Sequence, residues 1–299
     1  MNGILNIYKE AGFTSHDVVA KLRGILKQKK IGHTGTLDPD AEGVLPVCVG
    51  NATKLCGFLT EKEKTYEAVL LLGRETDTQD ISGRILRSQE VTAGEEEVQK
   101  AIESFLGSYD QIPPMYSARK INGKKLYELA REGKEVERQA RSVTLSEIAI
   151  SWIRIPEASF TVTCSSGTYI RTLCHDIGEK LGCGGCMKSL LRTRVDRFSL
   201  ADSLRLSQIE AKMAKGSIED CLIPVDHMFL RNPAIHMKKA GDRLVYNGNS
   251  FEPGSLCEGG TAEAEEGLKV RVYDSGGVFV GLYRYERGMF RPVKMFLGS

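Results

Sequence analysis

One carboxylate lies in a stretch of the chain where glycine and proline restrict the backbone. Residues 32–39 read Gly-His-Thr-Gly-Thr-Leu-Asp-Pro, and Asp38 is the acid among them. Glycine allows backbone angles that other residues avoid and proline fixes one angle, so such a loop can hold one side chain in a defined direction. A carboxylate held in this way can act as a nucleophile. The other interpretation is that Asp38 merely starts an Asp-Pro turn, which is the preferred interpretation of an isolated Asp-Pro pair.

The elements on either side of this loop can be predicted from their patterns. Residues 3–8 are typical of a short strand, and Ser15 could cap a helix that follows it. That helix would have apolar side chains at helical spacing and lysines that suit the negative end of its dipole, namely Val18, Leu22, Ile25, Leu26, Lys27, Lys29 and Lys30. Residues 31–46 lack periodicity and are rich in glycine and proline, which predicts a constrained loop rather than a helix or a strand.

Further elements between residues 65 and 210 must carry the rest of any site around Asp38. Residues 65–72 are apolar on both faces, as in a buried strand, and residues 80–83 predict the turn of a hairpin with a second strand. A capping box of Thr92 and Glu95 would open a helix that Gly107 stops, and Ser207 with Glu210 would open another. The patterns also predict a short helix over 126–131, strands over 143–153 and 158–164, and a helix after Gly167 with Ile170, Leu173, Ile177 and Leu181 on one face. Because this mixture lacks a regular βαβ alternation, it favours an α+β domain over a doubly wound fold.

The last part of the chain has a different character. Residues 224–233 have little periodicity and can serve as a linker. Residues 241–296 are rich in glycine and contain alternating segments such as 268–273 and 278–285, which predicts a small β-rich domain. We therefore expect a larger domain over residues 1–230 and a smaller one over residues 231–299.

Composition limits the class of protein. Of 299 residues, 41% are hydrophobic and 27% are charged, as in an ordinary globular protein. We expect a cytoplasmic protein, because the sequence contains neither a secretory leader pattern nor a long apolar stretch. The eight cysteines are expected to be free thiols. Cys183 and Cys186 form a CxxC, but no second pair completes a zinc site, so no metal is expected.

Charge gives a weaker indication. The formal net charge of +2 is too small to indicate a nucleic-acid partner by itself. Residues 119–141 nevertheless carry eight lysines and arginines against four glutamates. A basic surface is one interpretation of this segment, and an ordinary solvated helix face is the other.

A longer match decides between the interpretations of Asp38. The segment GHTGTLDPDAEGVLPVCVGNATKL resembles the signature of the TruB family of tRNA pseudouridine synthases. The resemblance continues, in order and spacing, in Lys64-Thr65-Tyr66, in Gly73-Arg74-Glu75-Thr76-Asp77-Thr78, in Ile112-Pro113-Pro114-Met115-Tyr116-Ser117-Ala118 and in Gly167-Thr168-Tyr169-Ile170-Arg171. It covers about residues 3–200. It implies a mixed, mainly antiparallel sheet in the larger domain.

The resemblance also implies roles for individual residues. Asp38 resembles the indispensable catalytic aspartate, and Arg171 resembles the arginine that pairs with it and would keep it ionised. Tyr66 resembles the tyrosine that stacks on the target base, whereas without the resemblance it would be a strand tyrosine in the core. Tyr169 resembles a second aromatic residue that lines the uracil pocket, and His33 resembles the histidine that fills the space left by the base.

The implied reaction needs few protein groups. Uridine becomes pseudouridine when the N1 to C1′ bond breaks, the uracil rotates and C5 joins C1′, with an anionic group beside C1′. The target base must first be flipped out of a folded RNA loop. Leu190 is the remaining residue expected to bind substrate, and Lys9, Lys64, Arg119, Lys124 and Lys125 are candidates for phosphate contacts. The implied partner is the T arm of tRNA, bound by a monomer without a cofactor.

The sequence departs from the family pattern at three points. Lys9-Glu10-Ala11-Gly12 lacks the usual proline, Leu190-Leu191-Arg192-Thr193 has leucine where many relatives have a first arginine, and the Cys183 to Cys186 segment more often ends in histidine. The C-terminal segment resembles a PUA domain through residues 270–273 and 277–281, and a β-rich appendage without RNA contacts is the alternative.

Three other functions use similar residues. A guide-RNA-dependent synthase of the dyskerin type shares the Thr-Leu-Asp-Pro segment, a hydrolytic glycosidase would need a second acid across the bond, and an RNA-folding chaperone would bind the T arm without chemistry.

Overall fold

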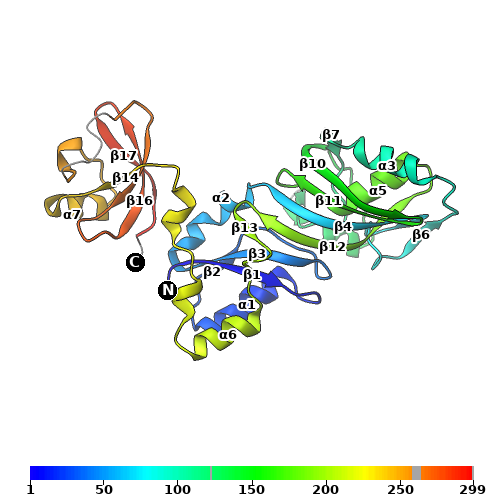
Figure 1. Cartoon of the computed structure of the whole chain (residues 1–299), viewed down its shortest axis with the longest axis horizontal. Helices are drawn as coiled ribbons and strands as arrows, with labels where there is room; N and C mark the ends of the chain where they lie inside the picture. Colours follow the sequence, from blue (N-terminus) through cyan, green and yellow to red (C-terminus); the bar gives the residue numbers. More distant parts are fainter. Residues whose placement is uncertain (122, 258–263, 298–299) are drawn as a thin grey trace.

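The computed structural model describes residues 1–121, 123–257 and 264–297. Among these residues, a nine-stranded sheet runs through the larger domain (Figure 1). Its main strands follow the order β1 (Gly3–Lys9), β3 (Glu42–Val49), β12 (Gly185–Val195), β4 (Lys64–Leu72), β11 (Glu157–Cys164), β10 (Arg141–Arg154) and β7 (Gly107–Gln111). Two short strands pair with inner strands of this order, β2 (Ile31–His33) with β3 and β13 (Phe198–Ser199) with β12. Neighbouring strands are antiparallel, except that β3 and β12 run parallel, so the mainly antiparallel α+β prediction is confirmed.

Helices cover the two halves of this sheet with separate apolar clusters. α1 (Ser15–Leu26) and α6 (Leu206–Ala214) pack Leu22 and Ile209 against Val47 of β3. α3 (Glu95–Glu103) and α5 (Ile170–Lys180) pack on the other half, in a cluster that includes Leu173 and Phe160. A short 3-10 helix, η1 (Gly50–Leu55), and α2 (Cys56–Thr60) connect β3 to β4 and pack in a third apolar cluster. The candidate loop after β2 lies where the two clusters meet, because Leu37 belongs to the second cluster and Ser15 to the first helix.

Three helices begin at residues other than the predicted ones. Thr14, not Ser15, caps α1, since its hydroxyl accepts a hydrogen bond from the backbone of Asp17. α3 follows Gly94 rather than a Thr92 cap, and α6 follows Arg205 rather than a Ser207 cap. In these two helices the side chain of Glu97 or Gln208, three residues after the cap, accepts a hydrogen bond from the backbone N–H of the cap residue. This is the one of the two capping-box bonds that needs no polar side chain on the cap residue itself.

Helix ends and the loop length also differ from the prediction. α1 ends at Leu26 and α3 at Glu103, so Lys29, Lys30 and Gly107 lie beyond them. Residues 31–33 and 42–46 are in β2 and β3, so the prediction of a loop over all of 31–46 is wrong at both ends. The constrained loop is residues 34–41. Pro46 lies within β3 opposite Asn6, and its carbonyl accepts from the backbone N–H and the hydroxyl of Thr34.

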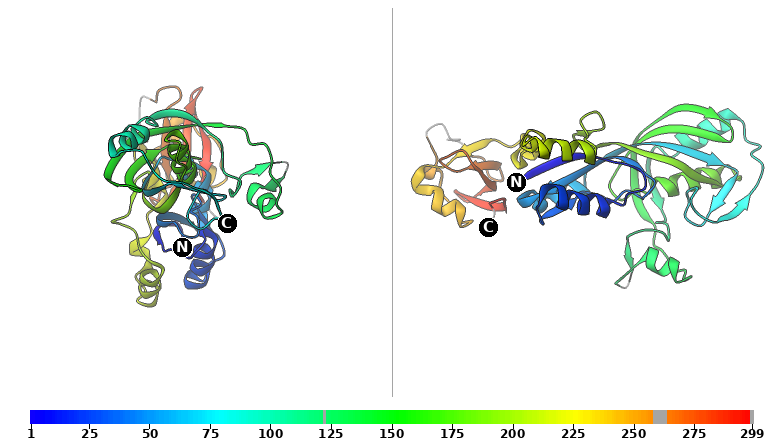
Figure 2. Two further views of the ribbon diagram at one scale, coloured as in Figure 1. Left: turned by 90° about the vertical axis from the view of Figure 1, so that its right-hand side faces the viewer. Right: turned by 90° about the horizontal axis from the view of Figure 1, so that it is seen from below.

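Most of the other elements are as predicted. The strands over 65–72, 143–153 and 158–164 are confirmed as β4, β10 and β11, and the helix over 126–131 as α4 (Leu126–Arg131). The turn over 80–83 does lie in a hairpin, formed by β5 (Arg74–Thr76) and β6 (Ile85–Ser88), but its predicted first strand is wrong, because β4 pairs with β11 and β12 instead. A second hairpin, β8 (Lys120–Ile121) with β9 (Lys124–Lys125), leads into α4. Figure 2 shows that the segment around β9 and α4, in green, projects from the body of the larger domain.

The smaller domain is a separate β-rich unit at one end of the elongated molecule (Figure 1). Its sheet has the order β14 (Ala234–His236), β15 (Lys269–Tyr273), β16 (Phe279–Glu286) and β17 (Met289–Met295), with α7 (Asp242–Tyr246) beside it. The predicted linker is not a free connector, because η3 (Val225–Phe229) buries Val225 and Phe229. Short 3-10 turns complete the chain, η2 (Ile218–Cys221), η4 (Lys239–Gly241) and η5 (Pro253–Ser255). Within the described ranges, none of the helices has the length and apolar character that crossing a bilayer requires.

Candidate active site

The backbone of the loop over residues 34–41 is held by side chains from three other elements. The hydroxyl of Ser15, in the first turn of α1, accepts a hydrogen bond from the backbone N–H of Leu37 at 3.0 Å. The ammonium of Lys9 donates to the carbonyls of Pro39 and Ala41 at 2.9 and 2.5 Å. The guanidinium of Arg192 donates to the carbonyl of Gly35 at 3.4 Å. A loop tied at both ends and in the middle can hold Asp38 in one direction.

Asp38 and Arg171 form a two-point ion pair. The Arg171 Nε lies 2.8 Å from Oδ2 of Asp38, and Nη2 donates to Oδ1 at 3.3 Å. The Arg171 side chain is 6% exposed and the Asp38 side chain is 39% exposed, so the carboxylate is open on one side. This fork-to-fork contact fixes the direction as well as the charge of the carboxylate. The prediction that Arg171 pairs with Asp38 is confirmed.

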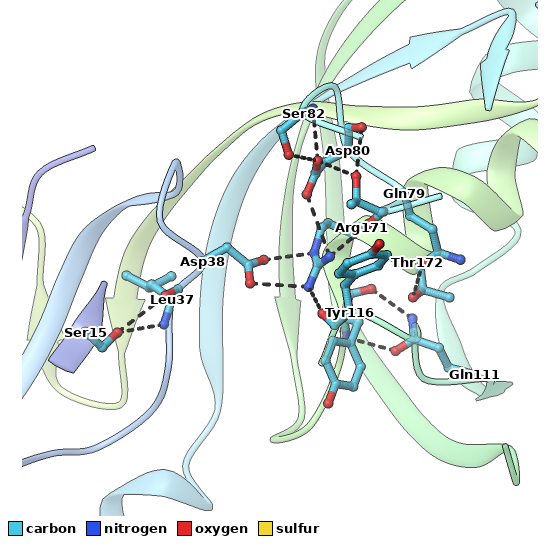
Figure 3. Close-up of polar contacts among 12 residues, drawn as sticks. Ser15, Leu37, Asp38, Gln79, Asp80, Ser82, Gln111, Tyr116, Arg171 and Thr172 are labelled. Carbon is cyan, nitrogen blue, oxygen red and sulfur yellow. Dashed lines mark hydrogen bonds and ion pairs between the residues drawn. The ribbon is translucent and has the colours of Figure 1, made fainter. Parts of the chain in front are cut away.

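The guanidinium of Arg171 is itself held from three sides (Figure 3). Nη1 donates to the carbonyl of Thr78 at 2.8 Å, and Nη2 donates to the carbonyl of Tyr116 at 2.9 Å. The carboxylate of Asp80 lies 3.7 Å from Nη1. Arg171 therefore has acceptors for most of its N–H groups although it is buried, as a buried cation requires.

Opposing effects set the pKa of the Asp38 carboxyl. Burial raises this pKa above its ordinary value, and the Arg171 guanidinium lowers it, while the charge of Asp80 adds to the increase. The two direct contacts to Arg171 oppose this increase and favour the ionised form of the carboxyl. An ionised, partly open carboxylate can attack or deprotonate a substrate atom that reaches it.

Two of the residues predicted to contact the base lie in the apolar cluster that reaches the loop carrying Asp38. Tyr66 of β4 and Leu190 of β12 are buried in the same cluster as Leu37, the residue before Asp38. Burial raises the pKa of the Tyr66 hydroxyl, so the phenol stays neutral. Tyr169 precedes α5, where Gln111 accepts from its N–H and donates to its carbonyl. Tyr66 and Leu190 therefore share an apolar cluster with the loop that carries Asp38, and the backbone of Tyr169 is held by Gln111.

His33 ends β2 and is half-buried. Its Nδ1 accepts a hydrogen bond from the backbone N–H of Gly35 at 3.4 Å, and its ring contacts that of His16 edge to face at 5.3 Å. Burial and the neighbouring His16 lower the pKa of His33. The ring is therefore neutral at pH 7.

The structure contradicts the prediction that Lys9 and Lys64 contact RNA phosphates. Lys9 is 0% exposed, and Lys64 is buried with its ammonium donating to the carbonyls of Thr60 and Lys62. Burial lowers the pKa of each to about 8. Both lysines hold nearby backbone carbonyls from within the protein. Arg119 and Lys124, in contrast, are exposed on the projecting segment.

Sequence reasoning missed three residues of the site. Asp80 was interpreted only as part of a turn, although a carboxylate between two short strands was an available signal. Arg192 stands in the segment compared with the family pattern, but its buried contact with Val44 could not be predicted from that segment, and Gln79 gave no signal because its role depends on the distant Thr172.

One group of side chains among the described residues could hold a metal ion. Ligand atoms of Glu75, His175 and Glu179 lie within 4.8 Å of one another. Arg87 already pairs with Glu75 at 3.2 Å and with Glu179 at 2.6 Å. An arginine bound to two of the three ligands offsets the charge that would attract a cation.

Two family models match consecutive parts of the chain. Residues 23–170 match the TruB family pseudouridylate synthase (N terminal domain), and residues 171–230 match the tRNA pseudouridylate synthase B C-terminal domain. Neither range includes residues 231–299.

Curated relatives match the chain over nearly its whole length. A protein named tRNA pseudouridine synthase B from Lachnoclostridium phytofermentans is 55% identical over 99% of this chain and 100% of its own. A protein of the same name from Bacillus subtilis (strain 168) is 40% identical over 99% of this chain and 98% of its own.

Solved structures agree on the fold. A Cbf5-Nop10-Gar1 complex contains a chain that is 25% identical, with a TM-score of 0.70, over 99% of this chain and 85% of that chain. An H/ACA RNP bound to a substrate RNA containing 2′-deoxyuridine gives a TM-score of 0.72 at 23% identity, over the same shares of the two chains. With both parts of its larger domain matched by family models and with identities of 40 to 55% along its length, the chain belongs to the TruB family of pseudouridylate synthases.

Proposed function

We propose that this chain isomerises the T-loop uridine of tRNA, conventionally numbered 55, to pseudouridine. The observation that carries the proposal is the ion pair between Asp38 and Arg171 beside the buried Tyr66 and Leu190. It holds a carboxylate beside a guanidinium that favours its ionised form, close to an apolar cluster that contains the residues proposed to contact the flipped base, and the reaction needs both. The names of the curated relatives support tRNA as the substrate.

Each residue has a definite part in this proposal. The Asp38 carboxylate meets the ribose of the extruded uridine, where it either adds to C1′ or removes the 2′ proton. Arg171 keeps that carboxylate ionised and directed. Tyr66, Tyr169 and Leu190 contact the uracil while it rotates, and His33 occupies the place that the base leaves in the RNA stack.

Binding of the RNA is proposed to depend on its phosphates. Arg119, Lys124 and Lys125 lie on the projecting segment, where they can reach an RNA that covers the site. Contacts of this kind release counterions, so affinity falls as salt rises. Residues 231–299 are proposed to form a PUA-like domain that contacts the same RNA.

We further propose that the protein works alone, as a cytoplasmic monomer. The competing function is that of a guide-dependent synthase, since the similar solved structures are complexes with other proteins or RNA. Against it, the 55% identical relative is named as a tRNA enzyme. A pure chaperone would leave the Asp38 and Arg171 pair without a use.

The test is an assay of the purified chain alone on an unmodified tRNA transcript, with pseudouridine mapped along the RNA. The proposal expects pseudouridine at position 55 without guide RNA or added protein. A transcript with cytidine at that position is the control and should remain unmodified. If modification requires guide RNA or partner proteins, the guide-dependent function replaces the proposed one.

A further inference from the structure

Gln79 has an unusual backbone conformation beside the catalytic pair. Its φ of 62° lies in the left-handed region, which residues other than glycine rarely adopt. It sits in the turn between β5 and β6, with Thr78 before it and Asp80 after it. Strained residues of this kind persist where the surrounding structure requires them, and they are often found at functional sites.

This conformation presents two acceptors to one guanidinium. The carbonyl of Thr78 accepts from Nη1 of Arg171 at 2.8 Å, and the carboxylate of Asp80 lies 3.7 Å from the same nitrogen. An extended or helical residue between Thr78 and Asp80 would direct these groups differently. The left-handed turn at Gln79 therefore shapes the surroundings of Arg171.

The side chain of Gln79 bonds directly to the helix that carries Arg171. Its Oε1 accepts a hydrogen bond from the hydroxyl of Thr172 at 2.7 Å, and Thr172 is 2% exposed (Figure 3). The backbone of Gln79 is held too, since its carbonyl accepts from the N–H of Met187 in β12 at 3.0 Å. Gln79 thus joins the β5–β6 turn to α5 and to β12.

We propose that Gln79, through its bond to Thr172, is a positioning residue that holds Arg171 in the orientation in which it pairs with Asp38. Gln79 acts through Arg171 and has no contact with the reacting atoms. The inference rests on the proposed function for its effect on the reaction. Its effect on the ion pair can be measured without RNA.

Two substitutions separate the side-chain bond from the backbone conformation. Gln79→Gly places at this position a residue that adopts the left-handed region freely, and it removes the side-chain carboxamide that accepts from Thr172. Thr172→Val keeps the shape of the side chain and removes the donor. Thr172→Ser is the conservative control, because it retains the hydroxyl.

We expect Gln79→Gly and Thr172→Val each to slow single-turnover pseudouridine formation by about tenfold, with tRNA affinity unchanged. The double variant should be no slower than either single variant, since both remove the same bond. The acid side of the pH–rate profile should move to higher pH, because a less firmly held Arg171 lowers the pKa of Asp38 less. Thr172→Ser should restore the rate and the profile.

The titration of the Asp38 carboxyl by carbon-13 NMR in the free protein gives a readout that does not require activity. The inference expects a higher pKa in Gln79→Gly and in Thr172→Val than in the wild-type protein. If both variants melt at lower temperature but keep the wild-type carboxyl pKa and rate, Gln79 is only structural and the inference is overturned. If the wild-type protein forms no pseudouridine but both variants show the higher carboxyl pKa, the proposed function fails and the positioning role stands.

Discussion

At the scale of single residues, the site depends on the two-point contact of Asp38 with Arg171 and on Lys9, whose ammonium holds the loop that carries Asp38. Asp38, Tyr66 and Arg171 were recognised from the segments that contain them, and the pairing of Asp38 with Arg171 is observed at 2.8 Å. Lys9 and Lys64 have the same residue type as surface phosphate ligands. Their burial follows from partners far along the chain, such as Pro39 and Ala41 for Lys9.

Arg171→Lys is expected to slow pseudouridine formation by roughly tenfold to a hundredfold, because an ammonium cannot form the two parallel bonds of a guanidinium. The carbonyls of Thr78 and Tyr116 would also lose donors. Single-turnover assays on tRNA transcript measure the rate, and binding assays check that affinity is retained. Arg74→Lys, on the exposed start of β5, is the control and should match the wild-type rate.

Lys9→Met is expected to alter the pH dependence of stability. The pKa of Lys9 is lowered from 10.5 to about 8 in the folded protein, so between these values the unfolded chain holds a proton that the folded chain has lost. The contribution of Lys9 to the free energy of unfolding therefore rises with pH through this window and is smallest below it.

Denaturant titrations between pH 7 and about 10.5 give the free energy of unfolding of the wild-type protein and of Lys9→Met, and the difference between the two values measures the effect. The difference should grow in favour of the wild type as pH rises. Lys100→Met, at an exposed position of α3, should give a difference that does not change with pH. A flat difference for Lys9→Met would contradict the assigned burial.

At the scale of elements, the periodic helices and the buried strands could be predicted, and their ends could not. Val18 and Leu22 fix the buried face of α1 from the sequence alone. Its cap is Thr14 rather than Ser15 because neighbouring hydroxyls compete, and Ser15 instead bonds to the loop at Leu37. The parallel contact of β3 with β12 also has no local signal, since it joins segments about 150 residues apart.

Gly43→Ala is expected to destabilise the protein by more than about 2 kcal/mol. Gly43 has a φ of 107°, and an added Cβ would lie 2.2 Å from the carbonyl oxygen of Arg192 in β12. Urea denaturation measures the loss. Gly24→Ala in α1 is the matched control, because a Cβ there meets no atom within 4 Å, and it should stabilise the helix by about 0.5 to 1 kcal/mol.

At the scale of the whole molecule, two domains could be predicted from the change in composition, but their packing could not. Aromatic residues join them, since Phe229 of the connecting segment contacts Phe58 of α2 at 5.6 Å and Phe296 at 5.8 Å between ring centroids. Lys54 also donates to the carbonyls of Met295 and Leu297. The two domains are therefore packed together through a shared apolar cluster.

Phe229→Ala is expected to separate the domains, because it removes the ring that contacts both of them. The free energy of unfolding should fall by about 3 kcal/mol, and proteolysis within residues 224–233 should become faster. Calorimetry should resolve two transitions in this variant and one in the wild type. Val278→Ala, at an exposed position of the smaller domain, should leave the single transition unchanged.

The central claim is that the carboxylate of residue 38 performs the chemistry. The most direct measurement is pseudouridine formation by Asp38→Asn beside Asp40→Asn, which changes an exposed carboxylate two positions along the same loop. Asp38→Asn should bind tRNA with wild-type affinity and form no detectable pseudouridine, while Asp40→Asn should be active. A rate for Asp38→Asn equal to that of the wild type would contradict the assignment.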